Sequence, residues 1–336
     1  MPSPALDQSF WIPAPTLTEK NIDDQQGKVF IVTGGYVGVG YQLSRILHQR
    51  HGTVYIAGRS KQKADAAISA IKKENPSSRG RLVFLELDLA NLASVAKAAS
   101  DFMSREDHLN VLTNNAGVCE PPIGSRTCQG HELQMGTNCL GPFLFTKLLL
   151  PILRKTASTA PQGVRVTWAG SLGAHLQSPP DGIQFDGDGS PRNHTSQGVN
   201  YGQSKAGNFY LAREFSKKLK DDGVVSVVCS PELTQGSEGN GADRIGLQPW
   251  ESQIRNAATW KYDAQGTRVY GAYTELYAGW SKDITLEKTG AWVIPWGRFG
   301  QLRDDIEKGC ENGVSAKFWA WCEAESKEFC SEAAQY

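Results

Sequence analysis

Two hydrophobic patterns alternate from residue 28 to residue 230, and this alternation restricts the fold more than any other feature of the sequence. Continuous apolar runs, typical of strands buried on both faces of a sheet, occupy residues 28–35, 53–59, 81–90, 109–117, 164–170 and 224–230. Segments with helical spacing of apolar residues lie between them, at 40–50, 63–75, 92–103, 131–153 and 201–220. Strict alternation predicts the α/β class, with a doubly wound parallel sheet and right-handed crossovers.

The remaining segments divide the chain around this core, and we expect one domain overall. We expect a proline-containing N-terminal extension at residues 1–26 and the sheet-forming core at residues 27–235. Residues 236–300 concentrate tryptophan and tyrosine, which supply large apolar contact area, so we expect a C-terminal aromatic-rich lid over a substrate. The alternative is that these rings pack a C-terminal subdomain. Residues 301–336 are expected to form a helical tail.

Charge and cysteine content exclude several classes of protein. Lys and Arg number 35 against 35 Asp and Glu, so the basic excess of a nucleic-acid binder is missing. The seven cysteines form no CxxC pair, so the sequence indicates neither a metal site nor a disulfide framework. The most apolar stretch, 143–153, contains Lys147 and Pro151 and is shorter than the roughly 18 residues of a membrane span. No export signal is visible, so we expect a cytoplasmic protein without a membrane span.

The first motif that carries chemistry is TGGYVGVG, between a buried strand and a helix. Glycine lets the backbone approach a pyrophosphate closely, and the helix N-terminus then supplies N–H donors and partial positive charge. The glycines follow G-x-x-x-G-x-G, not the commoner G-x-G-x-x-G. The motif predicts a dinucleotide contact by Thr33, Gly34, Tyr36, Val37, Gly38, Val39 and Gly40.

The end of the next strand indicates which dinucleotide binds. NAD-preferring folds place an acid there for the ribose 2′-OH, whereas an arginine accommodates a 2′-phosphate. This strand ends in Gly58-Arg59-Ser60-Lys61, without an acid before Asp65. Arg59 and Lys61 therefore favour NADP(H). The alternative is a solvated basic turn.

A tyrosine and a lysine four residues apart, Tyr201 and Lys205, form the candidate catalytic pair. This spacing puts both side chains on one face of a helix. A phenol has too high a pKa for proton exchange at neutral pH, and a nearby ammonium favours the phenolate and lowers that pKa. Ser171 ends an earlier strand, where its hydroxyl could hold a substrate oxygen, and Asn138 lies in the helix after the NNAG turn.

With these residues, the chain resembles the short-chain dehydrogenase/reductase family over roughly residues 27–235. The resemblance is carried by an ordered set of motifs: TGGYVGVG at 33–40, LDLA at 87–90, NNAG at 114–117, Asn138, Ser171 and YGQSK at 201–205. The long separation of Ser171 from Tyr201 and the C-terminal extension are similar to the retinol-dehydrogenase-like branch, especially fungal members that act on secondary metabolites.

The resemblance implies a Rossmann fold and a role for each motif residue. Tyr201 would donate or accept the proton, and Lys205 would bind the nicotinamide ribose and lower the tyrosine pKa. Ser171 would polarise the carbonyl, and Asn138 would hold a proton-relay water. Further cofactor contacts are implied for Asp88, Leu89, Asn115, Ala116, Gly117, Pro231 and Thr234.

The segment after the sixth strand departs from the family pattern. Relatives usually carry Pro-Gly and, four residues beyond the glycine, a threonine that secures the nicotinamide carboxamide. Here Glu232 and Gly236 occupy those places, and Thr234 or Ser237 is the available substitute. This departure affects the contacts that the resemblance implies with the nicotinamide end of the cofactor.

Together the motifs predict an NADPH-dependent ketoreductase or alcohol dehydrogenase for a bulky lipophilic carbonyl, in secondary-metabolite biosynthesis. One alternative is a redox-neutral dehydratase, isomerase or cyclase that holds NADP as a structural group. Another is a non-catalytic NADP-sensing protein, although Asn138, Ser171, Tyr201 and Lys205 are all present. A homodimer through sheet-flanking helices is open, because the C-terminal tail could cover that surface.

Overall fold

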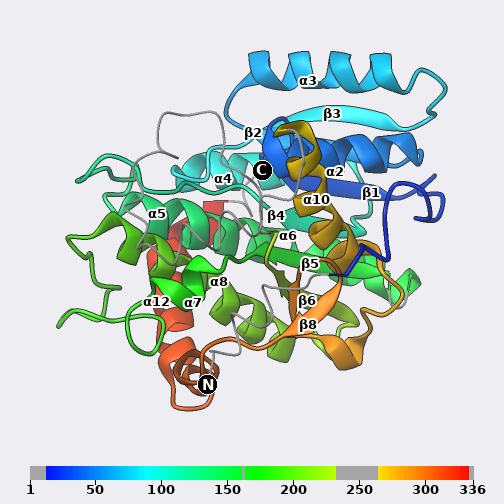
Figure 1. Cartoon of the computed structure of the whole chain (residues 1–336). Helices are drawn as coiled ribbons and strands as arrows, with labels where there is room; N and C mark the ends of the chain where they lie inside the picture. Colours follow the sequence, from blue (N-terminus) through cyan, green and yellow to red (C-terminus); the bar gives the residue numbers. More distant parts are fainter. Residues whose placement is uncertain (1–12, 161–162, 232–263, 333–336) are drawn as a thin grey trace.

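A computed structural model of the chain describes residues 13–160, 163–231 and 264–332 (Figure 1). Its centre is an eight-stranded sheet with the order β3-β2-β1-β4-β5-β6-β7-β8, in which β1 to β7 are parallel and β8 pairs antiparallel with β7. The strands are β1 Val29–Thr33, β2 Thr53–Gly58, β3 Arg81–Glu86, β4 Val111–Asn114, β5 Val164–Ala169, β6 Val224–Cys229, β7 Trp292–Ile294 and β8 Arg298–Gly300. The predicted α/β class with a doubly wound sheet is confirmed.

Helices cover both faces of the sheet (Figure 1). One face carries α2 Gly38–Gln49, α3 Lys61–Glu74 and α10 Ala264–Trp280. The other carries α4 Leu92–Arg105, α6 Gly141–Thr159 and α8 Gln197–Leu219, with α12 Val314–Glu332 packed outside them. The short elements are α5 Leu133–Met135, the π-helical turn η1 Gly136–Leu140, α7 Gly173–Leu176, the 3-10 turn η2 Leu286–Lys288 and α11 Asp304–Gly309.

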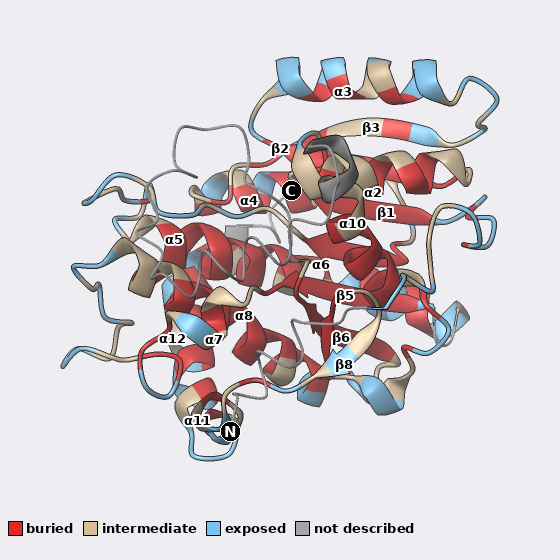
Figure 2. Cartoon of the chain, in the orientation of Figure 1, coloured by how far each residue is buried: buried red, intermediate tan, exposed pale blue. Residues whose placement is uncertain are grey.

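The central strands are buried on both sides (Figure 2), as their continuous apolar runs predict. In β5, Val166 and Trp168 belong to the core on the α8 side, where the Trp168 ring stacks on Phe215 at 5.2 Å. Thr167 points to the opposite face, toward Gly279 of α10. Successive side chains thus alternate between the two helix layers.

Residues 264–300 belong to the sheet and its helix layer. Tyr273 and Tyr277 of α10 are at most 8% exposed and pack between α10 and the strands. Trp292 of β7 is 5% exposed and belongs to the core on the α8 side of the sheet. This part of the predicted lid region therefore contributes rings to the core of the sheet. The rest of the predicted lid, residues 236–263, lies outside the described residues.

One helical stretch of the described chain, Leu133–Thr159, has the length and hydropathy of a membrane span. Within its most apolar window, 78% of the residues are buried in the structure. The stretch comprises α5, η1 and α6 and packs against α4, β5 and α12. This burial is that of a core helix.

Candidate active site

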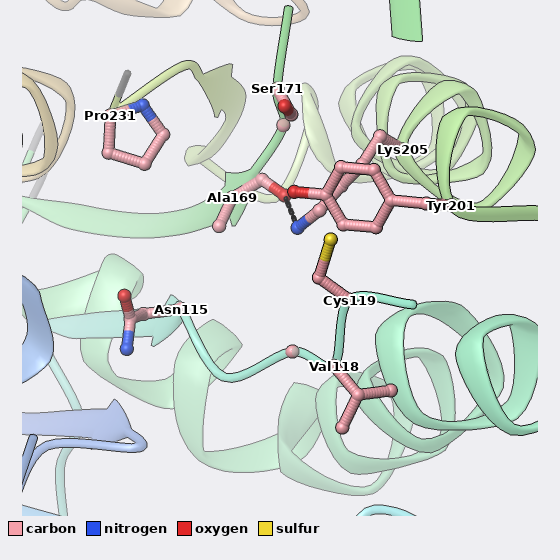
Figure 3. A pocket seen from close by; sticks show the side chains of 10 residues that line it. Asn115, Val118, Cys119, Ala169, Ser171, Tyr201, Lys205 and Pro231 are labelled. Atoms are coloured by element: carbon pink, nitrogen blue, oxygen red, sulfur yellow. Dashed lines mark hydrogen bonds between the residues drawn. The ribbon is translucent and has the colours of Figure 1, made fainter. Parts of the chain in front are cut away.

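A cavity of about 310 Å³ lies where β4 and β5 end, beside α8. Parallel strands present their carboxyl ends at one edge of the sheet, and ligands of open α/β sheets bind at that edge. The lining is Asn115, Gly117, Val118, Cys119, Ala169, Gly170, Ser171, Tyr201, Lys205 and Pro231 (Figure 3). The structure thus brings together three of the four predicted catalytic residues.

Helix α8 places Tyr201 and Lys205 one turn apart on the cavity side. The Lys205 Nζ lies 5.6 Å from the centroid of the Tyr201 ring and donates a 2.8 Å hydrogen bond to the Ala169 carbonyl. Asn208 donates to the same carbonyl through its Nδ2 at 2.9 Å. The ammonium is therefore fixed beside the phenol, whose hydroxyl points into the cavity in Figure 3.

Ser171 follows β5 directly and faces the same space. Its Oγ accepts a 3.0 Å hydrogen bond from the Gly173 backbone N–H, which leaves its own O–H able to donate to an oxygen in the cavity. A Cβ on Gly173 would lie 2.9 Å from the Tyr201 Cε1 and 3.2 Å from the Ser171 Oγ. The two hydroxyl-bearing side chains are therefore close neighbours, and their approach requires glycine at 173.

Asn138 lies behind the cavity wall, in the π-helical turn η1. Its Oδ1 accepts from the Val118 N–H at 2.8 Å, and its Nδ2 donates to the Val118 carbonyl and the Ser204 Oγ, both at 2.9 Å. The side chain thus ties the segment after β4 to α8. Its predicted part in holding a relay water stays a prediction.

The glycine loop has the shape that a pyrophosphate needs. Gly34 and Gly38 have φ of +68° and +58°, a region that L side chains rarely adopt. A Cβ on Gly40 would lie 2.6 Å from the Asn115 Nδ2. Val37, the N-cap residue of α2, is 51% exposed and makes no side-chain cap, so the first backbone N–H groups of α2 are available to an anion. The loop therefore fits a dinucleotide.

Thr33 joins the loop to the cavity. Its carbonyl accepts from the Asn115 Nδ2 at 2.7 Å, and its Oγ1 accepts from the Ala116 N–H at 2.9 Å. Gly117 follows, and a Cβ there would lie 3.6 Å from the Lys205 Nζ. The ends of β1 and β4 thus form one continuous floor between the glycine loop and the catalytic pair.

At the end of β2, the predicted basic residues have different surroundings. Arg59 is exposed. Lys61 is also exposed, and its Nζ pairs with the Asp65 carboxylate at 2.7 Å within α3. The Tyr36 ring lies against Gly58, where a Cβ would be 2.8 Å from the tyrosine hydroxyl. Arg59 is therefore the better placed of the two cations for a 2′-phosphate.

The remaining predicted contacts are divided between the surface, the core and the undescribed segment. The Asp88 Oδ1 accepts from the Ala90 N–H at 3.0 Å and shapes the turn after β3. The Leu89 side chain is 5% exposed and belongs to the core, so only its backbone could meet a nucleotide. Pro231 lines the cavity. Thr234 lies outside the described residues.

Several residues of this site were not predicted. Val118 and Cys119 line the cavity because they follow the NNAG turn, and their place beyond a strand end was the available signal. Burial raises the pKa of the Cys119 thiol to about 11, so it is neutral at ordinary pH. Gly173 and Asn208 act through contacts between distant segments, which no local pattern reveals.

Comparison with known proteins agrees with this geometry. The family model for short chain dehydrogenases matches residues 28–167. The short-chain dehydrogenase/reductase pkfC of Emericella nidulans is 42% identical over 319 residues, covering 94% of this chain and 97% of pkfC. The family member iacJ of Pestalotiopsis fici is 40% identical over 330 residues, covering 96% and 98%. A solved structure from Mycobacterium paratuberculosis superimposes with a TM-score of 0.64 at 26% identity, covering 93% of this chain and 97% of that one.

The fold, the glycine loop and the tyrosine–lysine pair define an oxidoreductase of the dinucleotide-binding class. The chain belongs to the short-chain dehydrogenase/reductase family, and pkfC and iacJ are fungal members of it, as the resemblance implied.

Proposed function

We propose that the protein is an NADPH-dependent ketoreductase, which moves a hydride between NADP(H) and a carbonyl or secondary alcohol carbon. The observation that carries this proposal is the convergence of Ser171, Tyr201 and Lys205 on one cavity. Asn115 and Gly117 line the cavity, and the Asn115 Nδ2 also donates to the Thr33 carbonyl at the start of the glycine loop, so the proposed sites for dinucleotide and substrate adjoin at one edge of the sheet.

The residues present fit the cofactor. Gly34, Gly38 and the N-terminus of α2 would hold the pyrophosphate, and Lys205 would bind the nicotinamide ribose. Bound NADPH supplies the hydride that the carbonyl carbon receives. Asn115 and Gly117 would line the space between these two contacts.

The protein's own side chains act on the substrate oxygen. Ser171 donates a hydrogen bond to this oxygen and so stabilises the negative charge that develops there. Tyr201 transfers its phenolic proton to the same oxygen, which completes the alcohol. The Lys205 ammonium, held by the Ala169 carbonyl, favours the phenolate that remains. Alcohol oxidation reverses each transfer.

Selectivity for NADP(H) over NAD(H) follows from the end of β2. An acidic side chain at position 58, where it could bind a ribose 2′-OH, would collide with the Tyr36 ring. Arg59 is exposed beside this position and offers a guanidinium to a 2′-phosphate. These two observations support the phosphorylated cofactor.

The proposed substrate is a bulky lipophilic ketone of secondary metabolism, and the proposed location is the cytoplasm. Val118 and Pro231 give the cavity apolar walls beside the catalytic hydroxyls. A homodimer, which the sequence left open, would need a surface other than the outer face of α4, α6 and α8 that α12 covers.

The test is NADPH absorbance of the purified protein with a panel of ketones that includes aromatic, terpenoid-like and sugar carbonyls. Consumption of NADPH with the lipophilic ketones supports the proposal. A strong preference for sugars would contradict the substrate class. Conversion without consumption would indicate a redox-neutral enzyme, and binding without conversion a sensor.

A further inference from the structure

Helix α10 carries a carboxyl group that the proposed mechanism does not use. Glu275 has no exposed surface, and neither of its carboxyl oxygens has a hydrogen-bond partner among the described residues. Buried polar groups are nearly always hydrogen-bonded, because an unpartnered one loses its interactions with water without replacement. A carboxyl in this state therefore needs a functional explanation.

The position of Glu275 follows from the direction of α10. Strands β6 and β7 are parallel, so the helix that connects them runs antiparallel to both. Gly279 lies over β4 and β5, where a Cβ would be 3.4 Å from the Val111 Cγ1 and 3.9 Å from the Thr167 Cγ2. Glu275 is one turn earlier on the same helix face, nearer the carboxyl ends of the strands. There Ala169 of β5 pairs with Cys229 of β6.

Glu275 and Lys205 thus approach the same strand ends from opposite faces of the sheet. The Lys205 Nζ is bonded to the Ala169 carbonyl, and Ala169 lines the cavity. Burial raises the pKa of Glu275 to about 8, and the positive charge of Lys205 opposes this rise. Glu275 in turn helps to raise the pKa of the Cys229 thiol. The carboxyl and the catalytic ammonium therefore share one electrostatic environment.

Other charged groups on the elements around α10 are few. Arg165 lies on the same face of β5 as Thr167 but at the opposite end of the strand. The positive charge of Arg45 of α2 opposes the rise in the pKa of Tyr273, which lies one turn before Tyr277 on α10. Strands β4 and β7 carry no charged residue. Within the described chain, Lys205 is the charged group that acts on Glu275.

We propose that Glu275 is a positioning residue that compensates positive charge at the active-site edge of β5 and β6 from the opposite face of the sheet. Its carboxylate form favours the Lys205 ammonium. It also favours an oxidised over a reduced dinucleotide, since the nicotinamide ring is cationic only when oxidised. The protonated form favours neither. This inference rests on the proposed function, because it requires the dinucleotide to bind beside Lys205.

The test compares dissociation constants of NADP⁺ and NADPH, measured by titration with purified protein at about pH 6 and about pH 9, on either side of the Glu275 pKa of about 8. The ratio of the two constants cancels the titration of the 2′-phosphate that both share. For the wild type we expect the preference for NADP⁺ to rise by about tenfold between these pH values, equivalent to a coupling of about one pKa unit.

Variants separate charge from structure. In Glu275→Gln, which is neutral at both pH values, the ratio should change less than about twofold, and Glu275→Asp should keep the direction of the wild-type change. Thr274→Val is the matched control, because it removes a buried hydroxyl that also has no partner among the described residues. It should behave as the wild type.

A second measurement uses the nucleotide-free protein. The folded-state pKa of Glu275 is raised above its ordinary value of 4.5, so the stability that protonation provides is complete below about pH 4.5 and is lost as the pH rises through about 8. The melting temperature should therefore fall more between about pH 6 and about pH 9 in the wild type than in Glu275→Gln.

Three results would overturn the inference. The first is a wild-type ratio of the NADP⁺ and NADPH dissociation constants that does not change with pH. This result would exclude the proposed role of Glu275 even if Glu275→Gln fails to fold. The second is a ratio in Glu275→Gln with the wild-type pH dependence, and the third is equal weakening of both nucleotides in that variant. If the wild type binds neither nucleotide, the proposed function fails as well; if it reduces ketones with a flat ratio, only this inference fails.

Discussion

At the carboxyl edge of the sheet, backbone shape distinguishes the proposed nucleotide end, whereas side chains distinguish the proposed reactive end. At the β1 end, Gly34 and Gly38 take positive φ and leave the N-terminus of α2 open. At the β5 end, Ser171, Tyr201 and Lys205 converge on one cavity. Changes at the β1 and β2 end should therefore act on cofactor affinity, and changes at the β5 end on the rate of the chemical step.

The largest effect should come from removal of the phenolic proton. Tyr201→Phe should lower kcat by about 1000-fold, because the ring remains but proton transfer to the substrate oxygen is lost. Steady-state kinetics with NADPH and a responsive ketone measure this. Tyr41→Phe is the control, since Tyr41 does not line the cavity and its hydroxyl donates to Glu74 at 3.3 Å. Near-full turnover in Tyr201→Phe would remove the proposed proton donor.

Removal of the second hydroxyl should cost less. Ser171→Ala should lower kcat by about 100-fold while the dissociation constant for NADPH stays within about twofold, because the hydroxyl acts on the developing negative charge. Ser104→Ala, which removes a hydroxyl that bonds the Asp101 carbonyl within α4, serves as the control. A loss confined to KM would show that Ser171 only binds substrate.

A smaller loss is expected from a change that adds one methyl group between these residues. Gly173→Ala would place a Cβ 2.9 Å from the Tyr201 ring and 3.2 Å from the Ser171 Oγ, so the two hydroxyls must move apart. We expect a decrease in kcat of roughly tenfold with little change in NADPH affinity. In Gly187→Ala the added methyl meets nothing within 4 Å, and this variant should be fully active. Unchanged kcat in Gly173→Ala would show that the close approach is not needed.

The smallest effect belongs to the nucleotide end. Arg59→Ala should raise KM for NADPH by about fivefold and leave kcat and the KM for NADH nearly unchanged, since it removes a cation from the place of the 2′-phosphate. Lys61→Ala is the comparison, because Lys61 already pairs with Asp65, and it should have less effect. Equal losses with NADPH and NADH would contradict the role of Arg59 in cofactor choice.

The shape of the glycine loop was predictable from the sequence because its backbone requirements are local. A glycine is needed wherever φ is positive or a backbone approaches another closely, and Gly34, Gly38 and Gly40 meet such needs within one short motif. The alternating apolar runs likewise predicted six strands, since burial on both faces leaves a continuous signal. The pairing of Lys61 with Asp65 was not foreseen, although its i, i+4 spacing was visible.

The reactive end was predictable only in part, because its geometry depends on contacts between distant segments. The spacing of Tyr201 and Lys205 predicted their shared helix face, but the hold of Asn138 on Val118 required the three-dimensional structure. The aromatic residues of the segment 236–300 predicted a lid by composition, yet Tyr273 and Tyr277 pack into the helix layer. The complete burial of Glu275 in α10 is likewise indicated by no local pattern.

The most direct test of hydride transfer at this cavity follows the hydride itself. The protein is incubated with a responsive ketone and NADPH that carries deuterium at the transferable position of the nicotinamide ring, and the product is analysed by mass spectrometry. Hydride transfer at this cavity should give one deuterium on the carbinol carbon in the wild type and almost no labelled alcohol with Tyr201→Phe. Unlabelled product formed at the wild-type rate would contradict it.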